Sequence, residues 1–196
     1  MGSLAAIVIA GGASSRFGSD KLAARDATGR TLLEVTVLGA AEVADPVVVV
    51  GPEVPLPVPV VWAREEPPGS GPCAALVAGL SCLPPEATHV AVLAGDAPRG
   101  ADAIPALRQV IDDAAVATVV DDLGREQPMT AVYAVAPLTA VTRRYGDGAG
   151  MPIRRALEDL RSRTVVALMD QWGASDDVDS AEDAARLGFR PDTSRG

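Results

Sequence analysis

Histidine, cysteine, aromatic residues and positive charge are all scarce in this chain of 196 residues. One histidine, His89, and two cysteines, Cys73 and Cys82, are too few for a His-rich zinc site or a disulfide framework. Aromatic residues make up 3% of the chain, so aliphatic side chains must fill the core. The formal net charge of −9 argues against a general nucleic-acid or membrane binder, because both need a basic face.

The beginning of the chain resembles neither a secretory signal nor a membrane span. Residues 1–9 are short, lack a basic start and run directly into glycines. Cys73 and Cys82 lie among Ala and Leu, which favours reduced thiols in a reducing compartment. We therefore expect a cytoplasmic protein. The length favours a single domain, which we place at residues 1–189, with 190–196 as a flexible tail.

Short apolar runs alternate with segments of helical periodicity in the first half. The runs are 4–9, 47–50, 58–62 and 90–93, and the helical segments are 31–43, 73–83 and 101–113. Runs that are apolar on both faces are typical of buried parallel strands, and the alternation indicates βαβ crossovers. We predict an α/β fold with a mainly parallel sheet and helices on both faces.

The second half is less regular. Strands are predicted at 115–120 and 130–135, joined by the polar segment 121–128, and a further strand at 164–169. Helices are predicted at 137–145 and 152–161. A last helix begins near residue 180, with Asp179 or Ser180 as its N-cap and acidic residues in its first turn.

The segment after the first predicted strand, residues 10–21, carries the clearest functional pattern. It reads Ala-Gly-Gly-Ala-Ser-Ser-Arg-Phe-Gly-Ser-Asp-Lys. Glycines at this edge of an α/β sheet let backbone N–H groups approach an anion, and the charges of Arg16 and Lys21 add to the attraction. Lys21 is the only lysine among 17 basic residues, and a compact ammonium suits a point contact to phosphate. The spacing matches neither the dinucleotide fingerprint nor the Walker A loop.

This segment closely resembles the signature of the molybdenum cofactor guanylyltransferase (MobA-like) nucleotidyltransferases. Ile9 stands for the family's leucine and Phe17 for its methionine. The resemblance implies a three-layer, Rossmann-like fold of the nucleotide-diphospho-sugar transferase type. It also implies that the segment binds a nucleoside triphosphate through the residues that match the signature, which are Ile9, Ala10, Gly11, Gly12, Ser14 and Lys21.

Further segments resemble the family in its order, up to about residue 187. Asp96, in a G-D-x-P motif after the fourth strand, is a suitable ligand for Mg²⁺. Glu66 stands where the family usually has Asp, and Gly71-Pro72 opens a helix at the nucleotide pocket. Asp179 matches a late family motif, as a second metal neighbour or as a helix cap. Val50-Gly51 replaces an asparagine that is frequent in the guanylyltransferases, which leaves the base preference open.

The resemblance implies Mg²⁺-dependent transfer of GMP from GTP to molybdopterin with release of pyrophosphate. Arg16, Lys21 and Asp96 are then the expected catalytic residues, and the nucleotide contacts include Val50, Glu66, Gly71, Pro72 and Asp96. The strand from Arg125 would face the acceptor, and Arg143, Arg144, Arg154 and Arg155 are candidate grips on it. Two alternatives are transfer from CTP or another triphosphate to molybdopterin or a different phosphorylated acceptor, and a non-catalytic nucleotide-binding maturation factor. We expect a monomer or homodimer without nucleic-acid or membrane partners.

Overall fold

The computed structural model is described here for residues 2–11, 20–160 and 165–191. It has one seven-stranded sheet with the strand order β3-β2-β1-β4-β6-β5-β7. Only β6 runs against the other strands in this sheet, so the sheet is mainly parallel. The strands are β1 (Ser3–Ile9), β2 (Val47–Val50), β3 (Val61–Ala63), β4 (Ala87–Ala94), β5 (Val116–Val120), β6 (Glu126–Ala134) and β7 (Val165–Met169).

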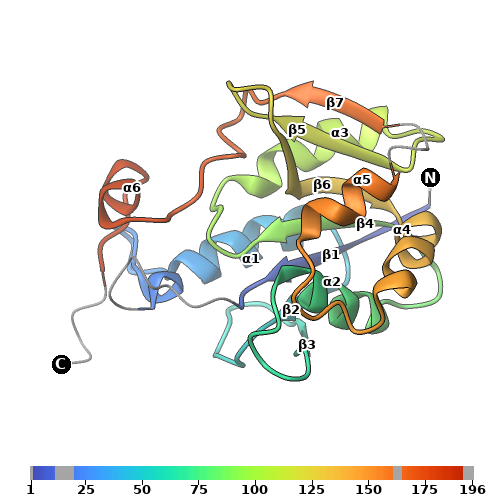
Figure 1. Cartoon of the computed structure of the whole chain (residues 1–196). Coiled ribbons are helices and arrows are strands. Elements are labelled where there is room, and N and C mark those ends of the chain that lie inside the picture. The colour runs from blue at the N-terminus through green and yellow to red at the C-terminus, as the bar shows by residue number, and fades with distance from the viewer. Residues whose placement is uncertain (1, 12–19, 161–164, 192–196) are drawn as a thin grey trace.

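Helices cover both faces of the sheet and make three layers (Figure 1). The α-helices are α1 (Leu32–Val43), α2 (Pro72–Ser81), α3 (Ile104–Val110), α4 (Val135–Thr142), α5 (Ile153–Leu160) and α6 (Ala181–Arg186). Three short 3₁₀ helices are η1 (Lys21–Ala23), η2 (Gly100–Ala103) and η3 (Arg143–Tyr145). No helix in the described ranges is long and apolar enough to span a membrane.

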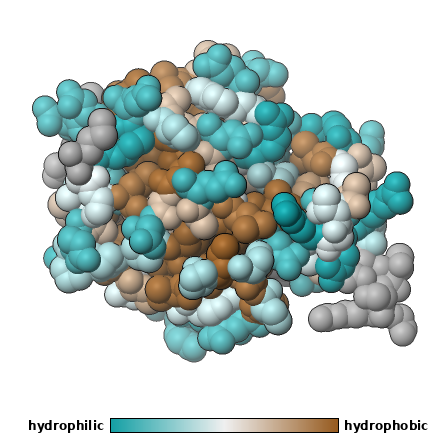
Figure 2. All heavy atoms as spheres, turned by 180° about the vertical axis from the view of Figure 1, so that it is seen from behind, coloured by the Kyte–Doolittle hydropathy of each residue, from teal (hydrophilic) through white to brown (hydrophobic). Residues whose placement is uncertain are grey.

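The core consists of two halves, one on each side of the sheet. Alternate residues of β1 face opposite sides: Ala6 and Val8 pack with α1 and α3, whereas Ile7 and Ile9 pack with α2, α4 and α5. Because both faces are covered, β1 is apolar over residues 4–9 and β4 over residues 90–94, as predicted. Figure 2 views the α1 and α3 side, where hydrophobic atoms remain visible between polar ones. Val43, Leu56 and Val58 are among the partly exposed side chains that border this half of the core.

The predicted fold class is confirmed, with differences at element boundaries. The third strand was expected at 58–62 but forms only at Val61–Ala63, because the prolines at 57 and 59 lack the N–H that a strand ladder needs. The helix expected at 101–113 is divided into η2 and α3, with Pro105 in the first turn of α3. Both cysteines are free thiols, Cys73 buried and Cys82 half-buried.

The second half differs more from the prediction. Strand β6 begins at Glu126, so the polar connection shrinks to a turn in which Asp121 accepts the N–H groups of Leu123 and Arg125. Helix α4 begins at Val135 instead of 137 and ends before η3. Arg190, assigned to the tail, exchanges backbone hydrogen bonds of 2.8 Å with Arg25 and is part of the folded domain. Residues 192–196 of that tail lie outside the described ranges.

Candidate active site

The carboxyl ends of neighbouring strands bring the predicted site together. Because β1 lies between β2 and β4, the residues after these strands meet at one edge of the sheet. Gly11 follows β1, Gly51 follows β2 and Asp96 follows β4. These strand ends point toward the side of the molecule that carries α6 (Figure 1). Ligands of open α/β sheets bind at this edge.

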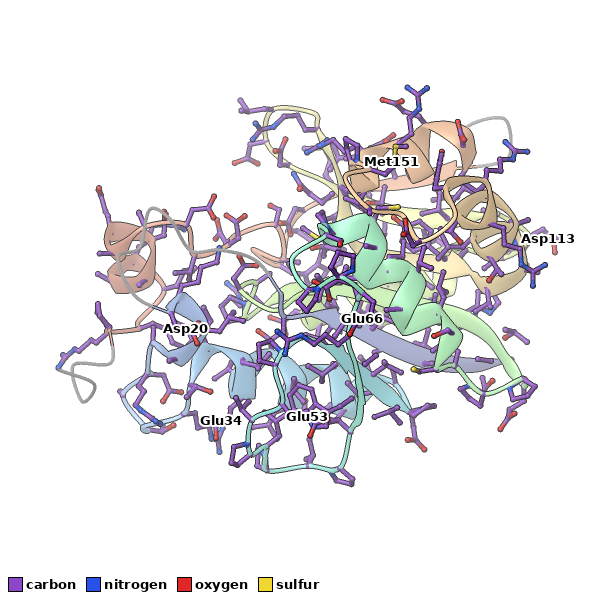
Figure 3. All side chains as sticks on the ribbon, turned by 60° about the horizontal axis from the view of Figure 1, so that its bottom comes forward. Asp20, Glu34, Glu53, Glu66, Asp113 and Met151 are labelled. Carbon is purple, nitrogen blue, oxygen red and sulfur yellow. The ribbon has the colours of Figure 1, made fainter. Side chains whose placement is uncertain are left out.

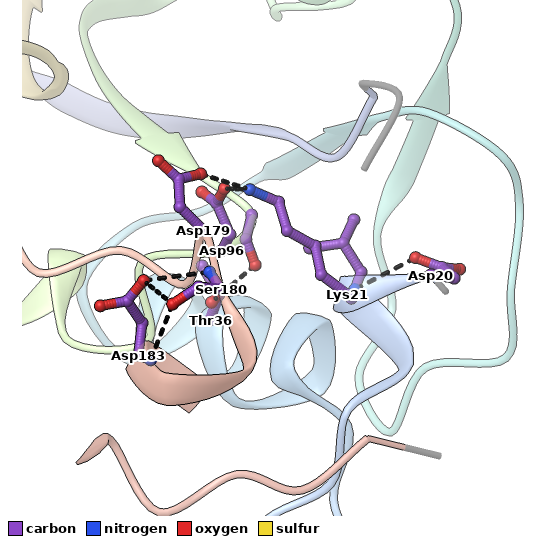
Figure 4. A network of polar contacts seen from close by, with 9 residues as sticks. Asp20, Lys21, Thr36, Asp96, Asp179, Ser180 and Asp183 are labelled. Carbon is purple, nitrogen blue, oxygen red and sulfur yellow. Dashed lines mark hydrogen bonds and ion pairs between the residues drawn. The ribbon is translucent and has the colours of Figure 1, made fainter. Parts of the chain in front are cut away.

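Lys21, Asp96 and Asp179 meet at this edge (Figure 4). The Lys21 ammonium contacts Asp96 Oδ2 and lies 3.1 Å from Asp179 Oδ1. The Lys21 and Asp96 side chains are 19% and 18% exposed, whereas Asp179 is 59% exposed. The three residues come from η1, the end of β4 and the segment before α6, so the fold alone brings them together.

The two carboxylates stabilise the charged form of Lys21. Burial by itself lowers the pKa of Lys21, but the hydrogen bonds and charges of Asp96 and Asp179 outweigh it, and the pKa is raised. Asp177, two residues before Asp179, has its pKa raised to about 6 by burial and by the charges of Asp179 and Asp96. Among the described residues, Lys21 therefore lies next to three carboxylates, those of Asp96, Asp177 and Asp179.

The donor atoms at this point suit Mg²⁺. Asp96 Oδ2 and Asp179 Oδ1 both contact the Lys21 ammonium, and carboxylate oxygens are the hard ligands that Mg²⁺ prefers. Within the described ranges, no group of three or more His, Cys, Asp or Glu side chains could hold a metal ion. Mg²⁺ is commonly held by one or two carboxylates together with phosphates and water. The residues fit a metal ion shared with a bound triphosphate.

A small apolar cluster holds two of the three residues in place. Ala24, Val178 and Phe189 are buried against one another, with Leu22 packed beside them. Lys21 precedes Leu22 and Asp179 follows Val178 in the sequence. Packing within this cluster therefore fixes the backbone positions of Lys21 and Asp179 relative to each other. The side chain of Asp20 accepts the N–H of Leu22 and caps η1. Ser180, with Asp183, forms the capping box of α6, so Asp179 is not the cap and its carboxylate faces Lys21.

Backbone and carboxylate groups line the edge beside β1. Ala10 N–H donates to the carbonyl of Val50, which joins the ends of β1 and β2. Gly51 is required there, because a Cβ at this position would lie 2.9 Å from the Ala10 carbonyl oxygen. A side chain such as the asparagine frequent in the family does not fit at Gly51. Gly11 is exposed to solvent, next to the side chain of Glu65.

The carboxylate beside Gly11 belongs to Glu65, which the sequence analysis did not select. Glu65 Oε1 would lie 3.4 Å from a Cβ at Gly11, and the residue is 7% exposed. Oε1 accepts the N–H of Gly69 at 2.9 Å, whereas the buried Oε2 has no hydrogen-bond partner in the described part of the chain. Glu66, the residue selected, is exposed on the loop before α2 (Figure 3). Because Glu65 and Glu66 are adjacent and identical, the sequence alone does not indicate which of them lies next to Gly11.

Other predicted residues lie near this edge or outside the described residues. Gly71 and Pro72 open α2 as predicted, with Gly71 at a φ of 102° and Pro72 in the first turn. The backbone of Cys73 in that turn packs against Gly148. The predicted residues Gly12, Ser14 and Arg16 fall in 12–19, outside the described residues.

The predicted acceptor side is built around the turn before β6. Asp121 accepts from Arg125 Nε at 2.7 Å and from Gln127 Nε2 at 3.0 Å, which holds both side chains. Arg154 donates to the carbonyl of Glu126 at the start of β6. The other candidate arginines are spread out: Arg144 pairs with Asp159, and Arg155 pairs with Glu158. The ion pairs of the described residues do not bring these arginines together into one binding site for an acceptor.

Known structures of the same architecture match this chain over nearly its whole length. Rv0371c from Mycobacterium tuberculosis H37Rv is 19% identical, with 95% of this chain and 97% of that chain covered and a TM-score of 0.75. A second structure of Rv0371c is a complex with manganese. Molybdopterin-guanine dinucleotide biosynthesis protein A from Archaeoglobus fulgidus is 17% identical, with 94% and 96% covered and a TM-score of 0.69.

A third protein extends the comparison to another substrate class. The 2-C-methyl-D-erythritol 4-phosphate cytidylyltransferase from Thermus thermophilus is 18% identical, with 93% and 95% covered and a TM-score of 0.65. At these identities the likeness establishes the fold alone. No curated protein matches this chain.

The sequence itself matches a protein family over residues 6–169. That range contains most of β1, all of β2 to β7, Lys21 and Asp96. It ends before Asp179 and α6, which the structure places beside Lys21. The chain therefore belongs to the family described as the MobA-like NTP transferase domain, and it is a nucleotidyltransferase by family.

Proposed function

We propose that this protein transfers GMP from GTP to molybdopterin in a Mg²⁺-dependent reaction that releases pyrophosphate. The observation that carries the proposal is the meeting of Lys21, Asp96 and Asp179 at the carboxyl edge of the sheet. One cationic group and two hard carboxylate ligands are the parts that a triphosphate and its metal ion require. Family membership supports the nucleotidyltransferase class, and the guanylyl and molybdopterin assignments are ours.

The chemistry needs positioning and charge more than covalent participation by the protein. A phosphate oxygen of the acceptor forms a bond to the α-phosphorus of the triphosphate as the bond to pyrophosphate breaks. Asp96 and Asp179 would hold Mg²⁺, which when bound supplies a positive charge that polarises the phosphate groups. Lys21 would offset the charge that develops on the leaving pyrophosphate. A phosphate monoester has a second pKa of about 6, so the acceptor needs no general base at neutral pH.

The glycine segment supplies the remaining phosphate contacts in this proposal. Backbone N–H groups of Gly11 and Gly12 would cradle the triphosphate, with Ser14 and Arg16 adding donors. The ends of β1 and β2 are joined next to these glycines, because the N–H of Ala10, which follows Ile9, donates to the carbonyl of Val50. Gly71 and Pro72 would border the same pocket from the start of α2. We transfer the role first given to Glu66 to Glu65, because only Glu65 lies next to Gly11.

Glu65 supports GTP over the other nucleotides. Its Oε2 is buried without a partner in the described residues, and a buried acceptor of this kind is costly unless a ligand donates to it. Guanine offers two adjacent N–H donors on one edge, which match the two oxygens of a carboxylate. Cytosine and adenine offer one amino group beside an acceptor nitrogen. We infer that the base lies against Glu65, where a carboxylate favours guanine, despite the glycine at position 51.

The acceptor and the metal ion of the proposal are supported by the structural neighbours. Molybdopterin as acceptor is supported by the similarity to the Archaeoglobus fulgidus protein, and the cytidylyltransferase neighbour makes another phosphorylated acceptor the alternative. The manganese complex of Rv0371c supports a divalent ion. We further propose a cytoplasmic monomer or homodimer.

A product assay tests the proposal. Purified protein is incubated with Mg²⁺, molybdopterin and one of GTP, CTP, ATP or UTP, and pyrophosphate and the dinucleotide are measured. We expect both products with GTP, and their loss when Mg²⁺ is chelated. Formation of both products with CTP would instead identify the reaction as cytidylyl transfer. Pyrophosphate formed only when a different phosphorylated alcohol replaces molybdopterin would change the acceptor. Absence of products with every pair would contradict the proposal.

A further inference from the structure

Thr36 links helix α1 to the loop that carries Asp96. Its hydroxyl lies 3.1 Å from the carbonyl oxygen of Leu32, one turn earlier in α1, and 3.1 Å from the carbonyl oxygen of Gly95. The residue is 1% exposed. The hydroxyl has one proton, which it shares between the Leu32 and Gly95 carbonyls, so Thr36 makes a contact to Gly95 beside the one to the carbonyl four residues back that is usual for a helical threonine. Figure 4 draws Thr36 below Asp96 in the same network of polar contacts.

The orientation of the Gly95 carbonyl determines the orientation of the backbone N–H of Asp96. The carbonyl belongs to the same planar peptide unit as the N–H of Asp96, so fixing the carbonyl fixes the orientation of that plane. Gly95 has no Cβ to limit its dihedral angles, and its own N–H is held by the Ile9 carbonyl at 2.9 Å. A Cβ at Gly95 would lie 3.0 Å from that Ile9 oxygen, so the position cannot easily be stiffened by a side chain.

The peptide unit on the other side of Asp96 is held as well. Val178 N–H donates to the Asp96 carbonyl at 3.1 Å. Val178 is the buried neighbour of Asp179. Thr36 and Val178 thus hold the two peptide planes that flank the Asp96 Cα. With both planes held, the direction of the Asp96 Cα–Cβ bond is set by α1 on one side and by the Asp179 segment on the other.

We propose that Thr36 is a positioning residue for Asp96, acting through the Gly95 carbonyl. The inference rests on the proposed role of Asp96 as a metal ligand, and it adds a buried group that touches neither nucleotide nor metal. Loss of the Thr36 hydroxyl would free the Gly95–Asp96 peptide to rotate. The carboxylate would then spend less time in the orientation that meets Asp179 Oδ1 at a shared cation.

The chain provides a matched control in Thr142. This residue is also a buried threonine in a helix, 3% exposed, and its hydroxyl contacts the carbonyl of Leu138 four residues back at 3.1 Å. Its second contact is the carbonyl of Thr139 in the same helix, α4, which packs on the opposite face of the sheet from α1. Replacement of either threonine by valine removes a hydroxyl with little change in shape. Of the two substitutions, only Thr36→Val removes a contact to the loop that carries Asp96.

The experiment compares Thr36→Val, Thr36→Ser and Thr142→Val with the unmodified protein in two measurements. The first is the Mg²⁺ concentration that gives half-maximal turnover with GTP and molybdopterin. We expect Thr36→Val to raise it about five-fold, the scale of one hydrogen bond, and Thr36→Ser and Thr142→Val to change it less than about two-fold. The second is amide hydrogen exchange without metal or nucleotide. We expect faster exchange at Ala97 and Val178 in Thr36→Val alone, after correction for global stability from urea unfolding.

The two measurements separate failure of this inference from failure of the proposed function. If the unmodified protein turns over and Thr36→Val matches Thr142→Val in both measurements, Thr36 does not position Asp96. If the unmodified protein shows no metal-dependent turnover, the proposed function fails, and the exchange at Ala97 and Val178 still decides whether Thr36 holds the loop. Equal exchange in the two valine variants would overturn the inference in that case too.

Discussion

The Lys21 ammonium forms an ion pair with Asp96, although Lys21 follows β1 and Asp96 follows β4. Because β1 and β4 are adjacent parallel strands, the fold places the two at the same edge. Asp179 closes the arrangement from the other end of the chain, 3.1 Å from the same ammonium. The lysine therefore lies where two carboxylates converge. Binding of a triphosphate with Mg²⁺ would exchange these partners, the lysine turning to phosphate and the carboxylates to the metal ion.

Replacement of Lys21 tests the charge at the leaving group. We expect Lys21→Ala to lower turnover by about 10² to 10³, the usual loss when one group that stabilises developing charge is removed. Lys21→Arg keeps the charge with a different geometry and should recover only part of the rate. Circular dichroism should show an unchanged fold for both variants. A turnover rate for Lys21→Ala equal to that of the unmodified protein would remove Lys21 from the mechanism.

Replacement of Asp96 tests the metal site. Asp96→Asn keeps the shape of the side chain but weakens it as a ligand, so we expect a steeply higher Mg²⁺ requirement and a lower maximal rate. Asp102→Asn is the control, since Asp102 pairs with Arg99 on an exposed part of η2. The measurement is turnover as a function of Mg²⁺ concentration for both variants. If Asp96→Asn and Asp102→Asn have the same Mg²⁺ dependence, the metal ion binds elsewhere.

Glu65 and Glu66 provide a test of base recognition with adjacent residues. We expect Glu65→Gln to raise KM for GTP about ten-fold to a hundred-fold, the range for losing hydrogen bonds to a charged group, and to change KM for CTP much less. Glu66→Gln should leave both constants near those of the unmodified protein, because Glu66 is exposed. Steady-state kinetics with both nucleotides check the prediction. An effect of Glu66→Gln equal to that of Glu65→Gln would contradict it.

Asp177 gives the protein a pH dependence with a defined sign. Its pKa is raised to about 6 in the folded protein from the ordinary 3.8, so the folded state binds more protons than the unfolded state between these values. Stability from this group is therefore present at low pH and is lost as pH rises through about 6. We expect Asp177→Asn to stabilise the metal-free protein at about pH 7.5, and less so at about pH 5. Urea unfolding with EDTA measures both. An equal gain at the two pH values would contradict the assignment.

Much of the fold and of the site followed from local patterns. The apolar runs at β1, β2 and β4 are strands because they are buried on both faces, and the glycines after β1 mark the edge where we propose that a ligand binds. Asp96 was found because a carboxylate directly after a buried strand is poorly explained by packing. Lys21 was found because it is the only lysine.

The remaining features depend on contacts between distant segments. Glu65 differs from Glu66 only in its burial and its approach to Gly11, which no sequence spacing encodes. Thr36 lies in the middle of α1 and meets Gly95 only because α1 packs over the end of β4. Whether Asp179 or Ser180 caps α6 was open from the sequence. The structure assigns the cap to Ser180 and turns Asp179 toward Lys21.

The central claim is that this edge of the sheet binds a nucleoside triphosphate together with Mg²⁺, and ligand-induced thermal stabilisation tests it most directly. GTP, CTP, ATP and UTP are each added with and without Mg²⁺, to the unmodified protein and to Lys21→Ala. A ligand at about 100 times its Kd adds about 2.7 kcal/mol, or roughly 5 to 10 °C for a chain of this length. We predict a shift of this size with GTP and Mg²⁺ that is largely lost without the metal ion and in Lys21→Ala. No shift of the unmodified protein with any nucleotide would contradict the account.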